Sequence, residues 1–287
     1  MKKTFSSKKS AFSLIELSVV LIVIGLLIAG VTGGASLIRS SELRSAMGEA
    51  RGYAVAVNGF YSQYAYLPGD YATSVASSIV PSTSTAAYTG GASSAQNGKI
   101  EYYTASVATY LSESVAAWDQ LIKTGTIDSS TSLTQVAPTT AQVPGTHMPS
   151  SKIKSAGWHF DYRTNVGTPG TDYTSTISEG TAATAAYQNV VVLTGTTTAS
   201  STTDTTAIAS TLVNGTNLST AAITGPDALS IDTKIDDSYA NAGKVRGLSP
   251  LNASTCYTAD TANNVSYTVT SSSSKVCALT FQVDVNS

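Results

Sequence analysis

The fold depends on one stretch near the N-terminus, Ser10-Ala11-Phe12-Ser13-Leu14-Ile15-Glu16-Leu17, which opens an apolar run that reaches Ile38. The 27 residues from Phe12 to Ile38 would form a helix about 40 Å long. The hydrocarbon core of a bilayer is about 30 Å thick. The run therefore predicts a helix that can span a membrane, with Glu16 as its only charge.

A carboxylate within a membrane helix needs a partner, because an unpaired charge costs about 2.5 kcal/mol or more at the bilayer centre. If the chain were cut after Ala11, the new α-amino group of Phe12 would lie about one helical turn from Glu16. That cation could pair with Glu16 of the same subunit or of a neighbouring copy. Either pairing would satisfy both charges.

The N-terminal residues match a known family. The segment Lys8-Lys9-Ser10-Ala11-Phe12-Ser13-Leu14-Ile15-Glu16-Leu17 resembles the leader and mature N-terminus of type IV pilins and of the pseudopilins of type II secretion. In that family a prepilin peptidase cuts before the Phe and N-methylates it, and the Glu directs assembly. The resemblance covers residues 8–38, and it implies these roles for Phe12 and Glu16. Ala11 stands where the family usually has Gly.

An ordinary signal peptide or signal anchor is the alternative for residues 1–38. A secretory signal has an apolar segment of about 7 to 15 residues, with a small-residue cleavage site after it. Here the apolar run is longer, and the small residue Ala11 precedes it. Both features favour the pilin-type interpretation.

The composition favours an extracellular protein that does not bind nucleic acid. Charged residues make up only 12% of the chain, whereas hydrophobic residues make up 42%, enough for a core. Removal of the leader with its four lysines takes Lys plus Arg from 16 to 12, against 18 Asp plus Glu. No basic stripe typical of nucleic-acid binding is present. The leader lysines instead hold the N-terminus in the cytoplasm, by the positive-inside rule.

Beyond Ile38 the spacing of apolar residues predicts that the helix continues. The apolar residues recur every three or four positions, as on one face of a helix; they are Leu43, Met47, Ala50, Ala54, Val57, Tyr61 and Tyr64. The other face carries Glu42, Arg44, Glu49, Arg51 and Asn58. Gly30, Gly33 and Gly34 predict either a compliant point, since glycine weakens a helix, or close approach between packed helices.

The rest of the chain predicts a head of helices, strands and long loops. The turn signal Leu67-Pro68-Gly69-Asp70 ends the first helix. Ser/Thr-rich stretches over 70–98, 126–150 and 196–206 predict exposed loops. The remaining expected elements are a helix over 106–125 with Trp118 as a core anchor, strands over 158–162 and 188–194, and a helix from Thr224 to Asp237.

Asp232, Asp236 and Asp237 cluster at the C-terminal half of the last expected helix, where the helix dipole disfavours negative charge. This suggests a calcium site, because Ca²⁺ takes six to eight oxygen ligands. The alternative is a solvated acidic helix end helped by Lys234, Lys244 and Arg246. We favour the alternative, because the ordered Asp-x-Asp-x-Asp-Gly spacing is absent. The sequence thus predicts no metal and no cofactor.

Cys256 and Cys277 are the only cysteines. An even pair in a head outside the cytoplasm predicts one disulfide. The residues around it, 265–270 and 275–285, predict an antiparallel hairpin turning at 271–274. A disulfide-closed C-terminal loop resembles the corresponding region of type IV pilins.

The sequence offers no catalytic signature. It contains no Gly-x-Ser-x-Gly, His-Glu-x-x-His, Cys-x-x-Cys or glycine-rich phosphate loop. His147 and His159 are too few for a typical zinc site. We expect a protein that is not an enzyme, with one loop histidine and one strand histidine.

These observations predict an α+β, pilin-like fold: a long N-terminal helix, half transmembrane and half amphipathic, packed on a small antiparallel sheet. The expected parts are a leader at 1–11, a transmembrane or filament-core helix at 12–38, an amphipathic helix at 39–66 and a globular head at 67–287.

The predicted function follows from the resemblance. It is a structural subunit of a type IV pilus-like filament, serving adhesion, motility or DNA uptake. Its expected partners are a prepilin peptidase, an inner-membrane assembly platform and other copies of itself, first in the bacterial inner membrane and then in an extracellular filament. A secretion pseudopilin and a monomeric membrane-tethered binding protein are the alternatives.

Overall fold

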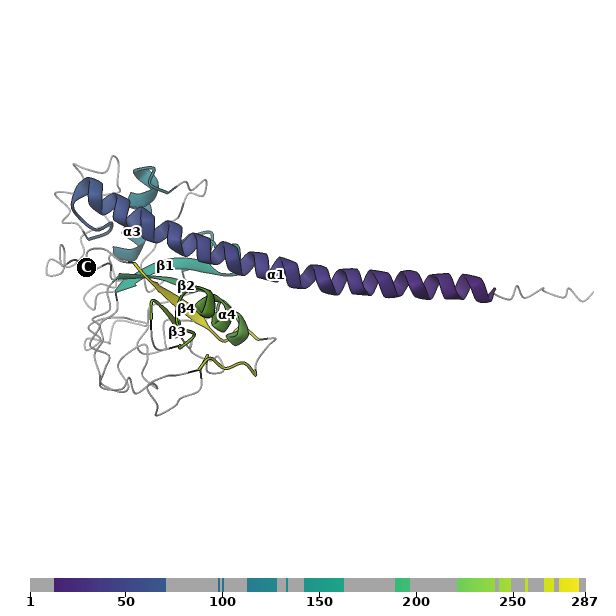
Figure 1. Ribbon diagram of the computed structural model, residues 1–287. Helices are drawn as coiled ribbons and strands as arrows, with labels where there is room; N and C mark the ends of the chain where they lie inside the picture. Colours follow the sequence, from purple (N-terminus) through teal and green to yellow (C-terminus); the bar gives the residue numbers. More distant parts are fainter. Residues whose placement is uncertain are drawn as a thin grey trace, which may run out of the picture. The chain divides into compact units, whose positions relative to one another are not determined.

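The computed structural model describes part of the chain and divides it into two compact units, Met1–Glu42 and Leu43–Ser287. The second unit is called the head below. The described residues are 13–70, 98, 100, 113–127, 133, 142–162, 189–196, 221–240, 243–248, 256–257, 266–270 and 274–283. The elements are α1 (Leu14–Tyr64), α3 (Glu113–Lys123), β1 (Gly157–Tyr162), β2 (Asn189–Thr194), α4 (Gly225–Ile235), β3 (Val245–Leu248) and β4 (Ala278–Gln282) (Figure 1).

The long helix α1 runs without interruption from Leu14 to Tyr64, so one helix contains both predicted halves. Its apolar side chains between Leu14 and Ile38 are exposed. Among the helices that the structure describes, only α1 is long and apolar enough to cross a bilayer. The helix gives way to Ala65, which has a positive φ, and to the turn at Pro68 and Gly69 that the sequence predicts.

The head contains a four-stranded antiparallel sheet in the order β1-β2-β4-β3. Alternate residues of each strand point to opposite faces, and one face joins the main hydrophobic core. That face contributes Trp158, Phe160, Val191, Leu193, Leu279 and Phe281. The segment of α1 within the head supplies Leu43, Ala50, Val57 and Phe60 to the same core. The α+β layout predicted from the sequence is confirmed.

Aromatic side chains join α1, α3 and β1. Trp118 of α3 is 1% exposed, and its ring stacks on Phe160 with ring centroids 4.2 Å apart. Tyr53 of α1 meets Trp118 edge to face at 4.8 Å and Trp158 at 5.6 Å. Trp118 is therefore the core anchor that the sequence predicts.

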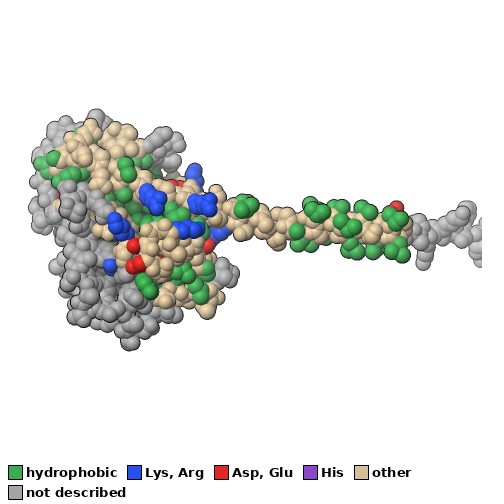
Figure 2. All heavy atoms as spheres, viewed as in Figure 1, with side chains coloured by type: hydrophobic (Ala, Val, Ile, Leu, Met, Phe, Trp, Pro, Cys, Tyr) green, Lys and Arg blue, Asp and Glu red, His purple; other side chains and the backbone are tan. Residues whose placement is uncertain are grey.

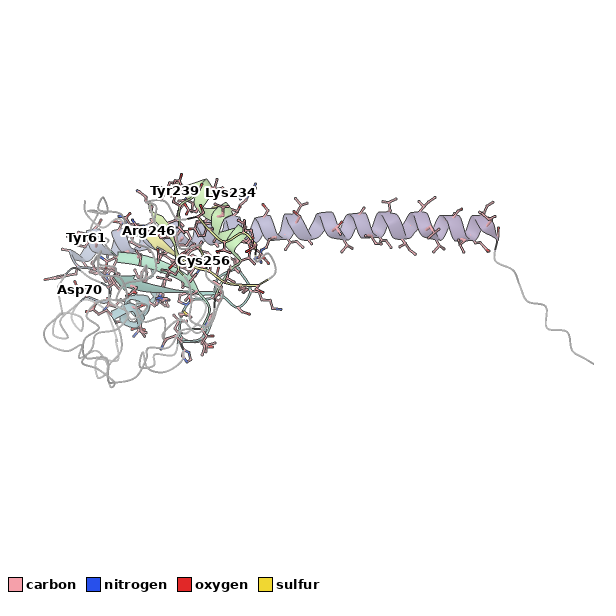
Figure 3. The ribbon with its side chains drawn as sticks, turned by 90° about the horizontal axis from the view of Figure 1, so that it is seen from below. Tyr61, Asp70, Lys234, Tyr239, Arg246 and Cys256 are labelled. Atoms are coloured by element: carbon pink, nitrogen blue, oxygen red, sulfur yellow. A yellow bond between two sulfur atoms is a disulfide. The ribbon has the colours of Figure 1, made fainter. Side chains whose placement is uncertain are left out.

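The segment between Asp70 and Gly98 begins and ends at one point of the head. The Asp70 carboxylate accepts a hydrogen bond from the Gly98 N–H (2.7 Å). Asn189, the first residue of β2, donates to the Gly98 carbonyl (3.2 Å) and accepts from the Ile100 N–H (2.6 Å). This closed stem lies at the end of the head opposite Lys234 of α4 (Figure 3).

The structure corrects the predicted C-terminal hairpin. The strand β4 pairs with β2 and β3, and Tyr267 forms an isolated bridge with Tyr257, so the described residues of 266–270 and 275–283 do not pair with each other. Long-range pairing with two strands satisfies both edges of β4, which a local hairpin would leave half open.

Other predicted segments lie partly outside the described residues. They are the hairpin turn at 271–273, the first part of the helix expected over 106–125, and most of the loops expected over 70–98, 126–150 and 196–206.

Candidate assembly site

Ser13 and Glu16 cap the N-terminus of α1. The Ser13 N–H donates to Glu16 Oε2 (2.9 Å), and Ser13 Oγ accepts from the Ile15 N–H (3.3 Å). This reciprocal arrangement is close to a capping box, in which a Ser at the cap and a Glu three residues later satisfy otherwise free N–H groups. The cleavage residues Ala11 and Phe12 lie outside the described residues.

The capping contact places the Glu16 carboxylate over the start of the helix, on the side of Phe12. In an apolar environment that carboxylate still carries a charge that favours a cation. The Ser-x-x-Glu spacing of Ser13 and Glu16 was visible in the sequence, and it is the signal that would have predicted the cap.

Gly30, Gly33 and Gly34 continue the helical path of α1 without a break. A Cβ placed on any of the three would meet no described neighbour within 4 Å. Both predicted uses of these glycines, compliance and close helix approach, remain predictions.

Within the head, Glu49 joins α1 to the turn before β1. Its carboxylate accepts hydrogen bonds from Ser151 Oγ (2.7 Å), the Lys152 N–H (3.1 Å) and Trp158 Nε1 (2.9 Å). Burial, and then the charge of Glu49, raise the pKa of the neighbouring Tyr53. The sequence placed Glu49 on the polar face of the helix, because helical spacing does not show which polar residue meets a partner from elsewhere in the chain.

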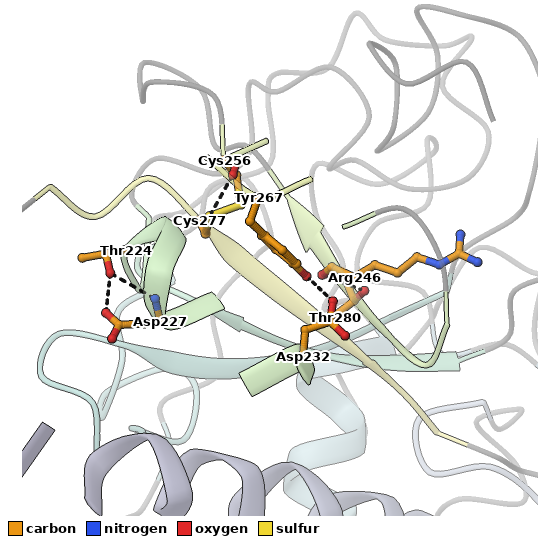
Figure 4. The surroundings of a disulfide bond; sticks show 8 residues. All are labelled: Thr224, Asp227, Asp232, Arg246, Cys256, Tyr267, Cys277 and Thr280. Carbon is orange, nitrogen blue, oxygen red and sulfur yellow. Dashed lines mark hydrogen bonds between the residues drawn. A yellow bond between two sulfur atoms is a disulfide. The ribbon is translucent and has the colours of Figure 1, made fainter. Parts of the chain in front are cut away.

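The three aspartates at the end of α4 come together, with one carboxylate oxygen of each within 4.8 Å of the others. The expected solvated acidic end is wrong for Asp232, which is 0% exposed. Its carboxylate accepts hydrogen bonds from Tyr267 Oη (2.7 Å) and the Ser238 N–H (3.2 Å) (Figure 4). Burial raises the pKa of Asp232 to about 6, despite these two bonds, and the neighbouring acids add to the rise.

Asp236 and Asp237 also accept hydrogen bonds from the backbone. Asp236 Oδ2 accepts from the N–H groups of Lys244 and Val245, and Asp237 Oδ1 from that of Tyr239. The described hydrogen bonds to the cluster thus come from N–H groups and a tyrosine, not from the side chains of Lys234, Lys244 and Arg246. These bonds account for the cluster without a cation, and the calcium hypothesis remains a prediction.

Cys256 and Cys277 form the disulfide that the sequence predicts. Both residues are fully buried. The Cys256 carbonyl accepts from the Thr268 N–H (2.8 Å), and the Cys277 N–H donates to the Ile223 carbonyl (3.0 Å). The bridge therefore ties the segments around Tyr267 and Ile223 to the start of β4 (Figure 4).

Comparison with known proteins bears on the N-terminus alone. The family model described as the prokaryotic N-terminal methylation motif matches residues 6–32. No curated protein and no solved structure matches the chain. The matched residues contain the Ala11-Phe12 junction, the capping pair and the apolar first half of α1. This chain therefore carries the prepilin signal of type IV pilins and pseudopilins.

Proposed function

We propose that this chain is a structural subunit of a type IV pilus-like filament, cut between Ala11 and Phe12 and N-methylated at Phe12 by a prepilin peptidase. One observation carries the proposal: the methylation motif at residues 6–32 leads directly into an apolar helix whose side chains the head leaves exposed. Exposed apolar surface of this extent requires a membrane or other protein chains to cover it.

In this proposal the apolar helix serves twice. It first holds the precursor in the inner membrane, with the head outside the cytoplasm. An assembly platform then extracts it, and the apolar segments of many copies pack together as the filament core. The proposed parts are the leader 1–11, the core helix 12–38, the amphipathic helix 39–66 and the head 67–287.

Glu16 and Phe12 set the axial register in this proposal. The methylated amine of Phe12 in one subunit is the cation that the Glu16 carboxylate of its neighbour requires in an apolar filament core. Pairing of the two charges then favours one axial offset between neighbouring subunits over all others.

The test is mass spectrometry of the N-terminal peptide, from membranes and from material sheared off cells. We expect a peptide that begins at N-methylated Phe12 in both fractions. Material that begins at Met1 and occurs only in membranes would overturn the proposal and leave a tethered binding protein. Processed subunits that never appear in the sheared fraction would assign the chain to a secretion pseudopilus, which stays in the periplasm.

A further inference from the structure

Basic residues gather at one end of the sheet in the head. Lys154 precedes β1 and Lys275 precedes β4. Both strands run antiparallel to β2, so they begin at the same end of the sheet. The Lys275 ammonium group donates to the Lys154 carbonyl, which brings the two residues into contact. With Lys152 and Arg44 they form a group that we call the basic edge.

The basic edge lies at the end of the head from which the apolar part of α1 departs. Glu49 of α1 bonds the turn at Ser151 and Lys152, next to the start of β1. Further along α1, Tyr53 contacts Trp158, and the stem that follows α1 meets Asn189 at the opposite end of the sheet. The start of the head's helical segment and the starts of β1 and β4 therefore share one end.

The charge of the basic edge faces solvent. Arg44, Lys152, Lys154 and Lys275 are all exposed, and Figure 2 shows Lys and Arg side chains gathered on one face of the head. Glu49 offsets little of this charge outward, because its carboxylate is held by three donors of the head.

The distance along α1 matches the depth of a bilayer surface. Six residues separate Ile38 from Arg44, or about 9 Å of helix. The polar headgroup layer extends about 5 to 8 Å beyond the hydrocarbon core on each side. If the apolar run fills the core, Arg44 lies at the outer boundary of the headgroups, and the other members of the basic edge project from the same end of the head.

We infer that the basic edge binds the phosphate groups of anionic phospholipids while the subunit is held in the membrane. The inference rests on the membrane-anchored precursor of the proposed function. Basic residues beside a transmembrane helix are attracted to an anionic bilayer surface, and each contributes about a fivefold factor to binding. The contact would restrain the head against the membrane until extraction.

The test uses the full chain in nanodiscs of phosphatidylcholine alone and of phosphatidylcholine with 30% phosphatidylglycerol by design. Amide hydrogen exchange is followed by mass spectrometry in peptides that cover the turn at 150–157. We expect exchange in this turn to be about fivefold slower with the anionic lipid at low salt. The difference disappears at high salt, where charges on the surface are screened.

Two double variants isolate the charge. Lys152→Gln with Lys154→Gln should abolish the protection, whereas Lys152→Arg with Lys154→Arg should retain it. The matched control is Lys123→Gln with Lys244→Gln, which removes the same charge. Lys244 precedes β3, which runs antiparallel to β4, so it lies at the opposite end of the sheet from Lys275. This control should protect as the wild type does.

Equal exchange with the two lipid compositions in the wild type would overturn the inference. Protection that is absent in anionic nanodiscs but present in sheared filaments would also overturn it, and would assign the basic edge to an acidic surface of a neighbouring subunit. The nanodisc result does not depend on cleavage at Ala11 or on filaments. Loss of the proposed filament function is therefore distinguishable from loss of lipid binding.

Discussion

At the scale of single residues, Glu49 contributes most to the attachment of α1 to the head. Glu49→Ala removes the acceptor for Ser151 Oγ, the Lys152 N–H and Trp158 Nε1. Hydrogen bonds to a charged group contribute about 1.5 to 3 kcal/mol each, and a donor left unsatisfied adds a further cost. We expect the free energy of unfolding to fall by about 3 kcal/mol.

Urea unfolding of the full chain in detergent, followed by tryptophan fluorescence, measures this loss. Glu42→Ala on the same helix is the control, because Glu42 is paired with Arg39 at 3.7 Å in an exposed position. Such pairs contribute about 1 kcal/mol or less. Equal effects of the two variants would contradict the role given to Glu49.

His159 predicts a loss of stability in acid. Burial lowers its pKa from 6.5 to about 3 in the folded head. Above pH 6.5 the histidine is neutral in both states. Below it, the unfolded chain binds a proton that the folded chain does not, so stability falls by about 1.4 kcal/mol per pH unit until the folded pKa is reached. At pH 5, His159→Gln should recover about 2 kcal/mol of that loss.

Asp232 acts in the opposite direction. Its pKa is raised from 3.8 to about 6, so between these values the folded chain binds the proton first and stability rises as pH falls. The wild type should therefore show a shallow pH dependence that its variants separate. Urea midpoints at pH 7 and pH 5 should fall more steeply for Asp232→Asn than for the wild type, and less steeply for His159→Gln. Parallel pH profiles for all three proteins would refute both assignments.

At the scale of elements, the turn after α1 depends on Gly69. Its φ of +86° lies in the left-handed region, and an added Cβ would lie 2.3 Å from the Glu113 carbonyl oxygen at the start of α3. The Gly69 N–H also donates to Gln120 Oε1 (2.7 Å). Gly69→Ala should therefore destabilise the head by about 2 kcal/mol or more.

The same glycine-to-alanine change at Gly52 is the control. Gly52 is exposed within α1, and its added Cβ would meet no described atom within 4 Å. Since Ala favours a helix over Gly by about 0.5 to 1 kcal/mol, Gly52→Ala should stabilise the head. The two variants should shift the urea midpoint in opposite directions, and shifts of the same sign would show that local packing does not control either effect.

Elements with local signals could be predicted from the sequence. The structure confirms α1 and its terminal turn, the strands β1 and β2 within a residue of their expected starts, and α4, which begins with Thr224 as its N-cap. The pairing of β4 and the contacts of Glu49 could not be predicted. Each joins residues that are distant in sequence, and neither leaves a periodic pattern within one segment.

At the scale of the whole molecule, Glu16 tests how subunits associate. Glu16→Ala removes the proposed partner of the Phe12 amine but keeps the apolar run that inserts into the membrane. We expect unchanged amounts of subunit in the membrane fraction and at least a severalfold loss of sheared filaments, measured by immunoblot.

Ser13→Ala is the matched control for Glu16→Ala. It removes the hydroxyl that accepts from Ile15 but leaves the Glu16 charge, so filaments should persist. Normal filament yield from Glu16→Ala would exclude a role for this carboxylate in register.

The stem formed by Asp70, Gly98 and Asn189 also bears on how such a protein can diversify. Its two ends are hydrogen-bonded to each other and to the sheet, and doubling the length of a closed segment costs only about 0.6 kcal/mol. Residues between the two ends can thus be exchanged, lengthened or replaced by a foreign peptide while the sheet and α1 keep their geometry. A population of cells could change what its filaments display at this position without changing how the filaments are built.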